Sequence, residues 1–257
     1  GQFIRTAGPN RMSMVPPRSI GRNDHGPATS VHGDQDVFGT PIRQLMDGEA
    51  PTLFHHDSPG VHNDEPSLML VNLWIPLQQI TQPLVLADGR SIDRKSHQLR
   101  YGLATDSFLE REDDAAINDI WMFLHDPDQR WFFRSEMDHR SAYVFNTLST
   151  PHGAGVLPGE SLAERCFRAL EAGESAAERG DADGLVDALA DIDETREPDE
   201  ATAALRRAIE GMLALADEAR SDPEAVCGPR SQDWVASSQA ARRSVVRRSL
   251  ELRVVVS

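Results

Sequence analysis

Cysteine is scarce in this chain, and its two copies are not spaced as a ligand pair or a redox motif. Cys166 and Cys227 lie in stretches that look helical or loop-like, and neither belongs to a C-x-x-C or zinc spacing. We therefore expect two free thiols, the usual state in a reducing compartment, rather than a structural disulfide.

Long apolar runs are absent as well. No stretch approaches the roughly 20 apolar residues that cross a bilayer. The opening segment, GQFIRTAGPNRMSMVPP, lacks the apolar core of a secretory signal. Together with the two thiols, these absences lead us to expect a cytoplasmic protein without a membrane-spanning segment.

Basic residues are outnumbered by acidic ones. The chain has 26 Lys and Arg against 41 Asp and Glu, for a formal net charge of -15. This balance argues against a nucleic-acid partner or an anionic membrane surface, because both need clustered cations. We expect a small-molecule partner, and the sequence does not indicate an oligomeric state.

Composition divides the 257 residues into four parts. Residues 1–36 are rich in Pro, Gly, Asn and Asp and predict an irregular N-terminal arm. Residues 37–156 hold short apolar runs separated by turns, which favour a β core. Residues 157–235 predict a helical insert that is a candidate lid, and residues 236–257 predict the final core strand.

Strands are predicted where short apolar or β-branched runs are bounded by turn residues. Arg130–Arg134 is expected to return against Ile120–Leu124 as a hairpin, and a helix is expected around Ser107–Asn118. Short strands with turns between them favour an antiparallel sandwich or barrel. The predicted strands besides the hairpin are Leu68–Leu77, Pro83–Ala87, Ala142–Leu148 and Ser244–Ser257.

Between residues 158 and 222 the chain is rich in Ala, Glu, Asp, Leu and Arg, and its apolar residues recur at helical spacing. We expect three or more amphipathic helices there, whose acidic residues form solvated faces. The recurring apolar positions are Leu162, Cys166, Phe167 and Leu170, then Leu185, Leu189 and Ile192, then Leu205, Ile209, Met212, Leu213 and Ala216.

Two histidine-x-aspartate triplets lie in the stretch from Pro51 to Leu77. Residues i and i+2 of a strand share a face, so His55 and Asp57 are expected to point the same way. His62 and Asp64 form the second copy. We prefer the first copy, because Asp64 leaves little chain for a crossover before Leu68, whereas Asp57 leaves an ordinary connection length.

A third ligand has to come from a distant part of the sequence, and His152 is the candidate. It follows a predicted strand and precedes Gly153 and Ala154, which let the backbone approach an ion closely. His55, Asp57 and His152 would form a two-histidine, one-carboxylate facial triad for Fe(II). Such a triad leaves positions for a bidentate 2-oxo acid and for dioxygen.

The far carboxylate of a 2-oxo acid needs a cation, and the last predicted strand offers one. Arg247 and Ser249 are two residues apart, so a guanidinium and a hydroxyl could grip one carboxylate together. Arg253 lies further along the same face and is a second candidate.

Four segments carry a family resemblance: NLWIPL (72–77), PLVLADGRSID (83–93), RWFF (130–133) with Met137, and RRSLELR (247–253). Together they resemble the hydroxylase/desaturase family of AsaB and CmcJ type from fungal and bacterial secondary metabolism. The WIPL run (74–77) also resembles phytanoyl-CoA dioxygenase-like enzymes.

The resemblance implies a non-haem iron, 2-oxoglutarate-dependent oxygenase on a double-stranded β-helix, that is, a jelly-roll, cupin-like core. It implies His55, Asp57 and His152 as iron ligands and Arg247 and Ser249 as 2-oxoglutarate ligands. The sequence departs from the family pattern at Ile75, where the family has Arg, and after His152, as well as in its long helical insert.

The expected function is hydroxylation or desaturation of a small metabolite from secondary or amino-acid-derived metabolism. In halogenating relatives a small residue replaces the carboxylate, so Asp57 indicates oxygenation and not chlorination. One alternative is a cupin-type metal-dependent isomerase or hydrolase that uses His55, His62 and His152. Another is a non-catalytic binding protein whose acidic helices form a partner surface.

Overall fold

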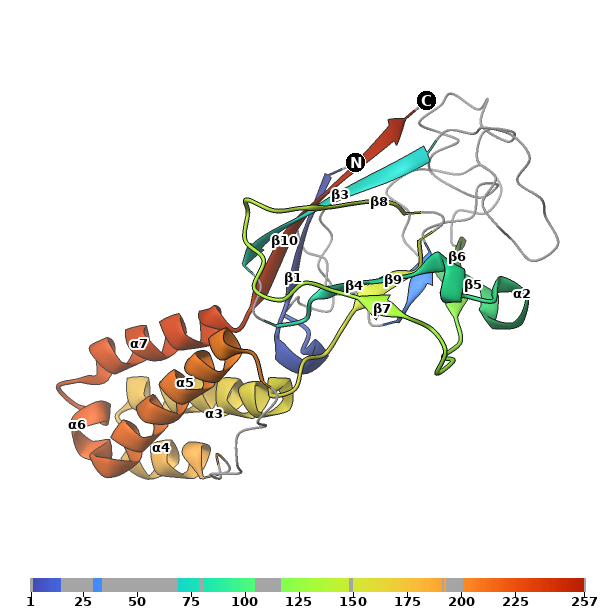
Figure 1. Cartoon of the computed structure of the whole chain (residues 1–257). Helices are drawn as coiled ribbons and strands as arrows, with labels where there is room; N and C mark the ends of the chain where they lie inside the picture. The colour runs from blue at the N-terminus through green and yellow to red at the C-terminus, as the bar shows by residue number, and fades with distance from the viewer. Residues whose placement is uncertain are drawn as a thin grey trace.

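The structure of the chain, a computed structural model, consists of a β part and a helical part (Figure 1). It describes residues 2–14, 30–33, 69–78, 81–104, 117–147, 150–190, 192 and 201–256. Mixed antiparallel sheets and helices were expected, and this coarse fold class is confirmed.

One sheet has four described strands in the order β1-β10-β3-β8. All of its neighbours pair antiparallel, and the long strands β3 and β10 pair with each other at its centre. The β10–β3 register shifts between Arg248 and Ser249. The strands are β1 (Gln2–Ala7), β3 (Met69–Gln78), β8 (Tyr143–Asn146) and β10 (Arg247–Val256).

The second sheet has six described strands in the order β5-β6-β2-β9-β4-β7, again antiparallel at every pairing. Short turns of helix, η1 (Pro9–Arg11), η3 (Gly89–Ser91) and α2 (Arg94–His97), accompany the strands. The strands are β2 (His32–Gly33), β4 (Leu84–Ala87), β5 (Gln98–Ala104), β6 (Ile117–Phe123), β7 (Trp131–Phe132) and β9 (His152–Ala154).

The inner faces of the two sheets meet. Trp74 of β3 packs with Leu84 of β4 and Phe145 of β8 in one buried cluster. On β3 the buried positions alternate, as a strand with one covered face requires. On β10 the same alternation buries polar residues, namely Arg247, Ser249 and Glu251. The space between the sheets is therefore polar at β10 and apolar near Trp74.

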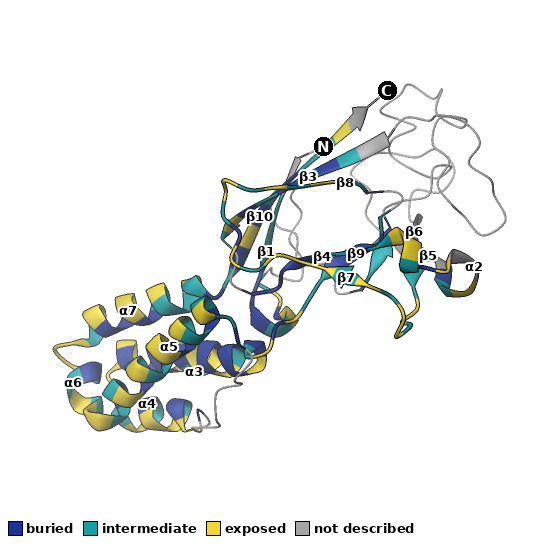
Figure 2. Cartoon of the chain, viewed as in Figure 1, coloured by how far each residue is buried: buried dark blue, intermediate teal, exposed yellow. Residues whose placement is uncertain are grey.

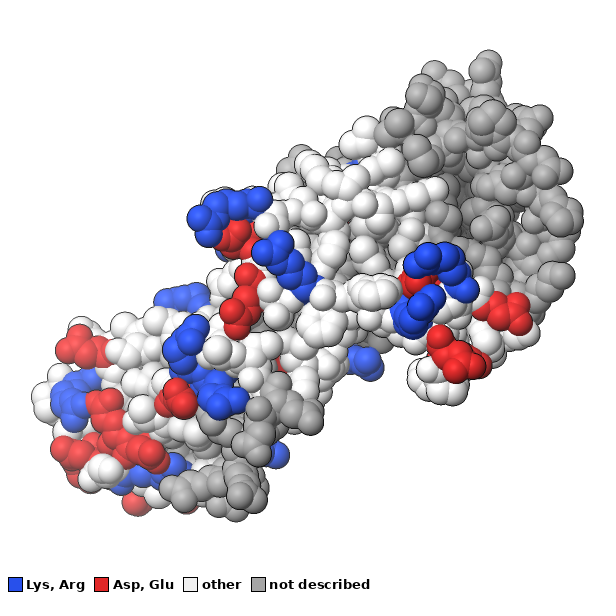
Figure 3. Space-filling model, in the orientation of Figure 1, with Lys and Arg blue, Asp and Glu red and all other residues white. Residues whose placement is uncertain are grey.

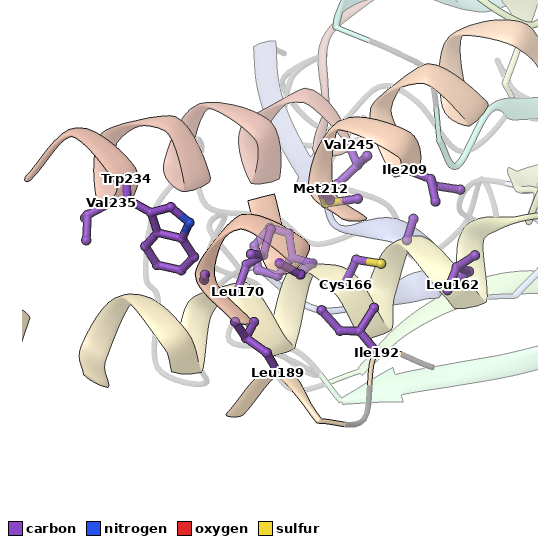
Figure 4. Close-up of a cluster of buried hydrophobic side chains, with 14 of the residues drawn as sticks. Leu162, Cys166, Leu170, Leu189, Ile192, Ile209, Met212, Trp234, Val235 and Val245 are labelled. Carbon is purple, nitrogen blue, oxygen red and sulfur yellow. The ribbon is translucent and has the colours of Figure 1, made fainter. Parts of the chain in front are cut away.

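The helical part has a core of its own. Leucines and small residues on the inner helix faces are buried, and the charged faces are exposed (Figures 2 and 4). Helix α3 ends at Arg179 and is capped by Gly180, whose φ of 71° gives the left-handed conformation that glycine adopts without strain. The helices are α3 (Glu160–Arg179), α4 (Ala182–Leu189), α5 (Ala203–Ser221), α6 (Pro223–Cys227) and α7 (Ser231–Ser244).

Most predicted elements are confirmed. The strands expected over 68–77, 83–87, 142–148 and 244–257 correspond to β3, β4, β8 and β10, and the helical segment forms α3 to α7. Both cysteines are free thiols. Burial raises the pKa of the Cys166 thiol to about 11.

Three expectations are wrong. The arm is not irregular throughout, since residues 2–7 and 32–33 form β1 and β2. Ile120–Leu124 and Arg130–Arg134 do not form a hairpin, because β6 pairs with β5 and β2, while β7 pairs with β4. The helix expected around Ser107–Asn118 does not extend to Asn118, because residues 117 and 118 belong to β6. The four-part division of the chain stays a prediction.

Charged side chains of both signs are interspersed over the helical part (Figure 3). The visible face of the β part shows fewer of them among its described residues. Within the described ranges, no helix is both long and apolar enough to span a membrane.

Candidate functional site

A small cavity of about 30 Å³ lies between the two sheets. Both sheets contribute walls, from β1, β3 and β10 on one side and β2, β4 and β9 on the other. This volume is room for about two waters, since one water needs about 10–15 Å³ on this measure. The lining residues are Arg5, His32, Asn72, Trp74, Leu84, His152, Gly153, Ala154, Arg247, Glu251 and Arg253.

Two histidines lie side by side on the second sheet. His32 of β2 and His152 of β9 are direct cross-strand partners, and their ring centroids are 4.5 Å apart. Phe145 of β8 contacts the His152 ring at 5.0 Å between centroids, edge to face. The strand pairing thus places two imidazoles on one cavity, although the two residues are 120 positions apart in the chain.

Each ring is oriented by the same kind of contact, to the carbonyl oxygen two residues before it. His32 Nδ1 lies 2.9 Å from the Ser30 carbonyl oxygen, and His152 Nδ1 lies 2.9 Å from the Thr150 carbonyl oxygen. A carbonyl oxygen only accepts hydrogen bonds, so Nδ1 carries the proton in both rings. In a neutral imidazole the lone pair then sits on Nε2. An Nδ1–H held by a carbonyl is the usual support of a metal-ligating histidine.

Arg247 of β10 places a buried cation at the opposite wall. Its exposed fraction is 3%, its Nη1 donates to the Gln82 carbonyl oxygen at 2.9 Å, and its guanidinium lies 5.8 Å from the centre of the Trp74 ring. Burial lowers the pKa of Arg247 from its ordinary value to about 10, and the nearby Glu251 and Glu160 carboxylates partly oppose this shift.

Arg247 has no carboxylate in ion-pair contact within the described residues. Glu251, the acidic residue that lines the cavity, pairs instead with Arg5, whose Nε lies 2.7 Å from its carboxylate oxygen. Among the described lining residues, the charged side chains are those of Arg5, Arg247, Arg253 and Glu251. The buried Arg247 guanidinium is the group on this wall that suits an anionic ligand.

Two further buried polar groups lie near this cation. Ser249 is fully buried on the same face of β10, and Asn72 of β3 is 1% exposed on the cavity wall. Ser249 Oγ, Asn72 Oδ1 and Arg247 Nε have no hydrogen-bond partner among the described residues. Buried polar atoms of this kind usually have a partner, so a polar ligand suits the cavity.

The predicted site residues separate into two groups. His152, Arg247 and Arg253 line the cavity, and Ser249 shares the inward face of β10. His55 and Asp57, like His62 and Asp64, lie outside the described residues, so their role stays a prediction. In the described part of the chain, no group of three His, Cys, Asp or Glu side chains is placed to hold a metal ion.

Sequence reasoning missed His32. Its neighbours spell His32-Gly33-Asp34, which is an H-x-D triplet like the two that were considered. The signal was present, but the surrounding segment lacks strand periodicity, and β2 has only two described residues. Asp34 itself lies outside the described residues.

Comparison with known proteins gives one family and a distant structural likeness. Two solved structures of the iron and alpha-ketoglutarate-dependent endoperoxidase NvfI, one a point variant and one in a different conformation, are 17% and 16% identical to the chain, each with a TM-score of 0.37. The matches cover 60% and 59% of this chain, which spans about half of those chains (51% and 50%). No curated protein matches.

The family model described as "YDMC: Oxidoreductase/YMDC permease-like domain" matches residues 4–174, well over half of the 257 residues. The matched range includes both cavity histidines, the greater part of β1 and all of β2 to β9. The chain belongs to this oxidoreductase/YMDC permease-like domain family.

Proposed function

We propose that the chain is an Fe(II)- and 2-oxoglutarate-dependent oxygenase that hydroxylates or desaturates a small molecule. One observation supports this above all. One wall of a single cavity has two oriented imidazoles. The opposite wall has a buried guanidinium that forms no ion pair with a carboxylate of the described residues. A metal ion and an acidic cosubstrate are the two ligands that these walls suit.

The proposed core is a double-stranded β-helix. Strands β1, β3, β8 and β10 lie in one sheet, whereas β2, β4, β7 and β9 lie in the other. Most successive strands therefore change sheet along the chain, as a jelly roll requires. The cavity lies between these two sets of strands, where a jelly roll encloses its ligand.

The residues present fit a metal in part. His32 and His152 would hold it through Nε2, because their Nδ1 atoms are committed to carbonyl oxygens. Asp34 is the carboxylate that we favour, since it follows His32 by two residues, the spacing that shares a strand face. This choice differs from the predicted pair His55 and Asp57. When bound, Fe(II) with 2-oxoglutarate and dioxygen supplies the oxidising power for attack on a C–H bond.

Arg247 would bind the far carboxylate of the 2-oxo acid. The buried guanidinium gains an ion pair there, and Ser249 Oγ gains an acceptor for its proton. Trp74 covers the guanidinium and limits access of water to this end of the cavity. A cupin-type hydrolase or isomerase has no use for such a carboxylate clamp.

Anaerobic titration tests the proposal. The protein with Fe(II) should develop a visible charge-transfer absorption only when 2-oxoglutarate is added, and with dioxygen it should release succinate. His32→Ala and Asp34→Ala should abolish the absorption. The matched pair His55→Ala and Asp57→Ala should retain it if the ligands are those we favour.

The outcomes separate the two ligand assignments from failure of the proposal. Loss of the absorption in the His55 and Asp57 variants alone would restore the predicted pair as ligands. An absorption absent from the wild-type protein, together with no succinate, would refute the oxygenase assignment itself.

A further inference from the structure

Glu160, the first residue of α3, is a fully buried carboxylate at the junction between the helical part and the sheets. Its Oε1 accepts the backbone N–H groups of Gln82 at 2.7 Å and Leu157 at 2.9 Å. Its Oε2 accepts the backbone N–H of Asn10 at 2.7 Å and the side-chain amide of Gln82 at 3.1 Å. Charge-assisted bonds of this kind are about twice as strong as neutral ones.

Two of these donors belong to turns in an unfavourable conformation. Gln82 has a φ of 48° and Asn10 a φ of 53°, both in the left-handed region. Such a residue costs about 1–3 kcal/mol and persists only where its surroundings hold it. The Glu160 carboxylate binds the backbone N–H of both residues, so it is the group that holds them.

The Gln82 turn is in direct contact with the proposed anion clamp. The Gln82 carbonyl oxygen accepts the hydrogen bond from Arg247 Nη1. This is the direct hydrogen bond that orients the guanidinium among the described residues. The direction of that carbonyl is fixed by the backbone angles of Gln82, and these depend on Glu160.

The other end of the helical part reaches the same turn. Thr81 Oγ1 donates to the Val245 carbonyl oxygen at 2.7 Å, and the Gln78 amide donates to the Arg243 carbonyl oxygen. Val245 precedes Arg247 by two residues. Entry into α3 and exit from α7 therefore both bind the segment between β3 and β4 (Figure 1).

We propose that Glu160 is a positioning residue for Arg247, and that the helical part holds the anion-binding arginine in place through Gln82. This inference rests on the role proposed for Arg247 in binding the 2-oxo acid. It assigns the helical part a supporting role in ligand binding, different from the lid that the sequence suggested.

Chemical labelling of the metal-free protein tests the inference without any ligand. Phenylglyoxal modifies accessible arginines, and peptide mass spectrometry measures each one, with the exposed Arg140 as internal standard. In Glu160→Gln the Arg247 labelling rate should rise about ten-fold, which corresponds to about 1.4 kcal/mol.

Glu174→Gln is the matched control. Glu174 is also a buried carboxylate of α3, but it accepts from Ser238 and Arg242 inside the helical part and makes no contact with Gln82. This variant should leave Arg247 protected. Equal exposure of Arg247 in both variants would mean a general loss of stability and would overturn the inference, as would unchanged protection in Glu160→Gln.

If Glu160→Gln does not fold, Gln82→Gly replaces it. Glycine adopts a φ of 48° without strain, so this variant keeps the backbone bond to Glu160 but removes the side-chain bond and frees the carbonyl to reorient. The labelling rate of Arg247 should then rise about three-fold, which corresponds to roughly half the free energy of a ten-fold change. Unchanged labelling would contradict the role of Gln82.

A second measurement links positioning to function. With Fe(II) bound, the KM for 2-oxoglutarate should rise about ten-fold in Glu160→Gln, equivalent to about 1.4 kcal/mol, while kcat at saturation stays within two-fold. A fall in kcat with unchanged KM would contradict positioning. If the wild type binds no 2-oxoglutarate, the proposed function fails, but the labelling result still decides whether Glu160 positions Arg247.

Discussion

Replacing Arg247 with methionine tests whether its buried charge serves ligand binding or folding. Burial lowers the pKa of this arginine from its ordinary value to about 10, a difference that corresponds to a cost of about 3 kcal/mol for the charged form. Because folding lowers the pKa, this cost is fully present below pH 10. It is recovered only as the pH rises from about 10 towards the unfolded value.

Methionine removes that cost but leaves the Gln82 carbonyl oxygen without its donor, which costs about 1–3 kcal/mol. The two effects nearly cancel. Because no described carboxylate pairs with Arg247, the substitution leaves no buried carboxylate without its partner. We therefore expect the free energy of unfolding to change by less than about 2 kcal/mol, well below the 3–5 kcal/mol that follows from breaking a buried ion pair.

Affinity for 2-oxoglutarate should respond strongly. Losing one partner of a buried, hydrogen-bonded charge pair costs about 2–5 kcal/mol, so Kd should rise at least about 30-fold. Urea denaturation measures the free energy of unfolding, and anaerobic titration with Fe(II) measures the Kd for 2-oxoglutarate. The exposed Arg140→Met is the control. Destabilisation above about 4 kcal/mol with unchanged affinity would show that the charge is structural and would refute the reasoning.

Three smaller perturbations test separate parts of the account. Ser249→Ala should weaken 2-oxoglutarate binding about five-fold, the value of one hydrogen bond near 1 kcal/mol, with stability unchanged because Oγ has no described partner. Unchanged affinity would remove Ser249 from the site. Native Cys166 should resist alkylation at pH 8, since burial raises its pKa to about 11, and rapid labelling would contradict that burial. Leu170→Ala should cost about 2–5 kcal/mol in thermal unfolding, because Leu170 is fully buried; a smaller loss would mean that the helical core repacks.

The elements with strong periodicity could be predicted from sequence. The leucines of α3 and α5 recur on one helix face, and β3 and the end of β10 are marked by apolar or β-branched runs. Alternation also placed Arg247 and Ser249 on one buried face, even though the strand pairing shifts between Arg248 and Ser249. Local patterns of this length carry enough information to fix both the element and its inward face.

Pairing between distant strands could not be predicted in the same way. The β6–β7 hairpin was expected because the two runs are adjacent in sequence, yet β7 pairs with β4 across the sheet. A two-residue strand such as β2 has no period to detect, so His32 was assigned to an irregular arm. Its place beside His152 follows from a long-range register that only the folded sheet displays.

The most direct test of the central claim is a crystal structure of the protein with Mn(II) in place of Fe(II) and with 2-oxoglutarate. We expect the ion to be bound by His32 and His152, with the far carboxylate of the 2-oxo acid on Arg247. An ion bound away from these histidines, or a 2-oxo acid that leaves Arg247 without an anion, would contradict it.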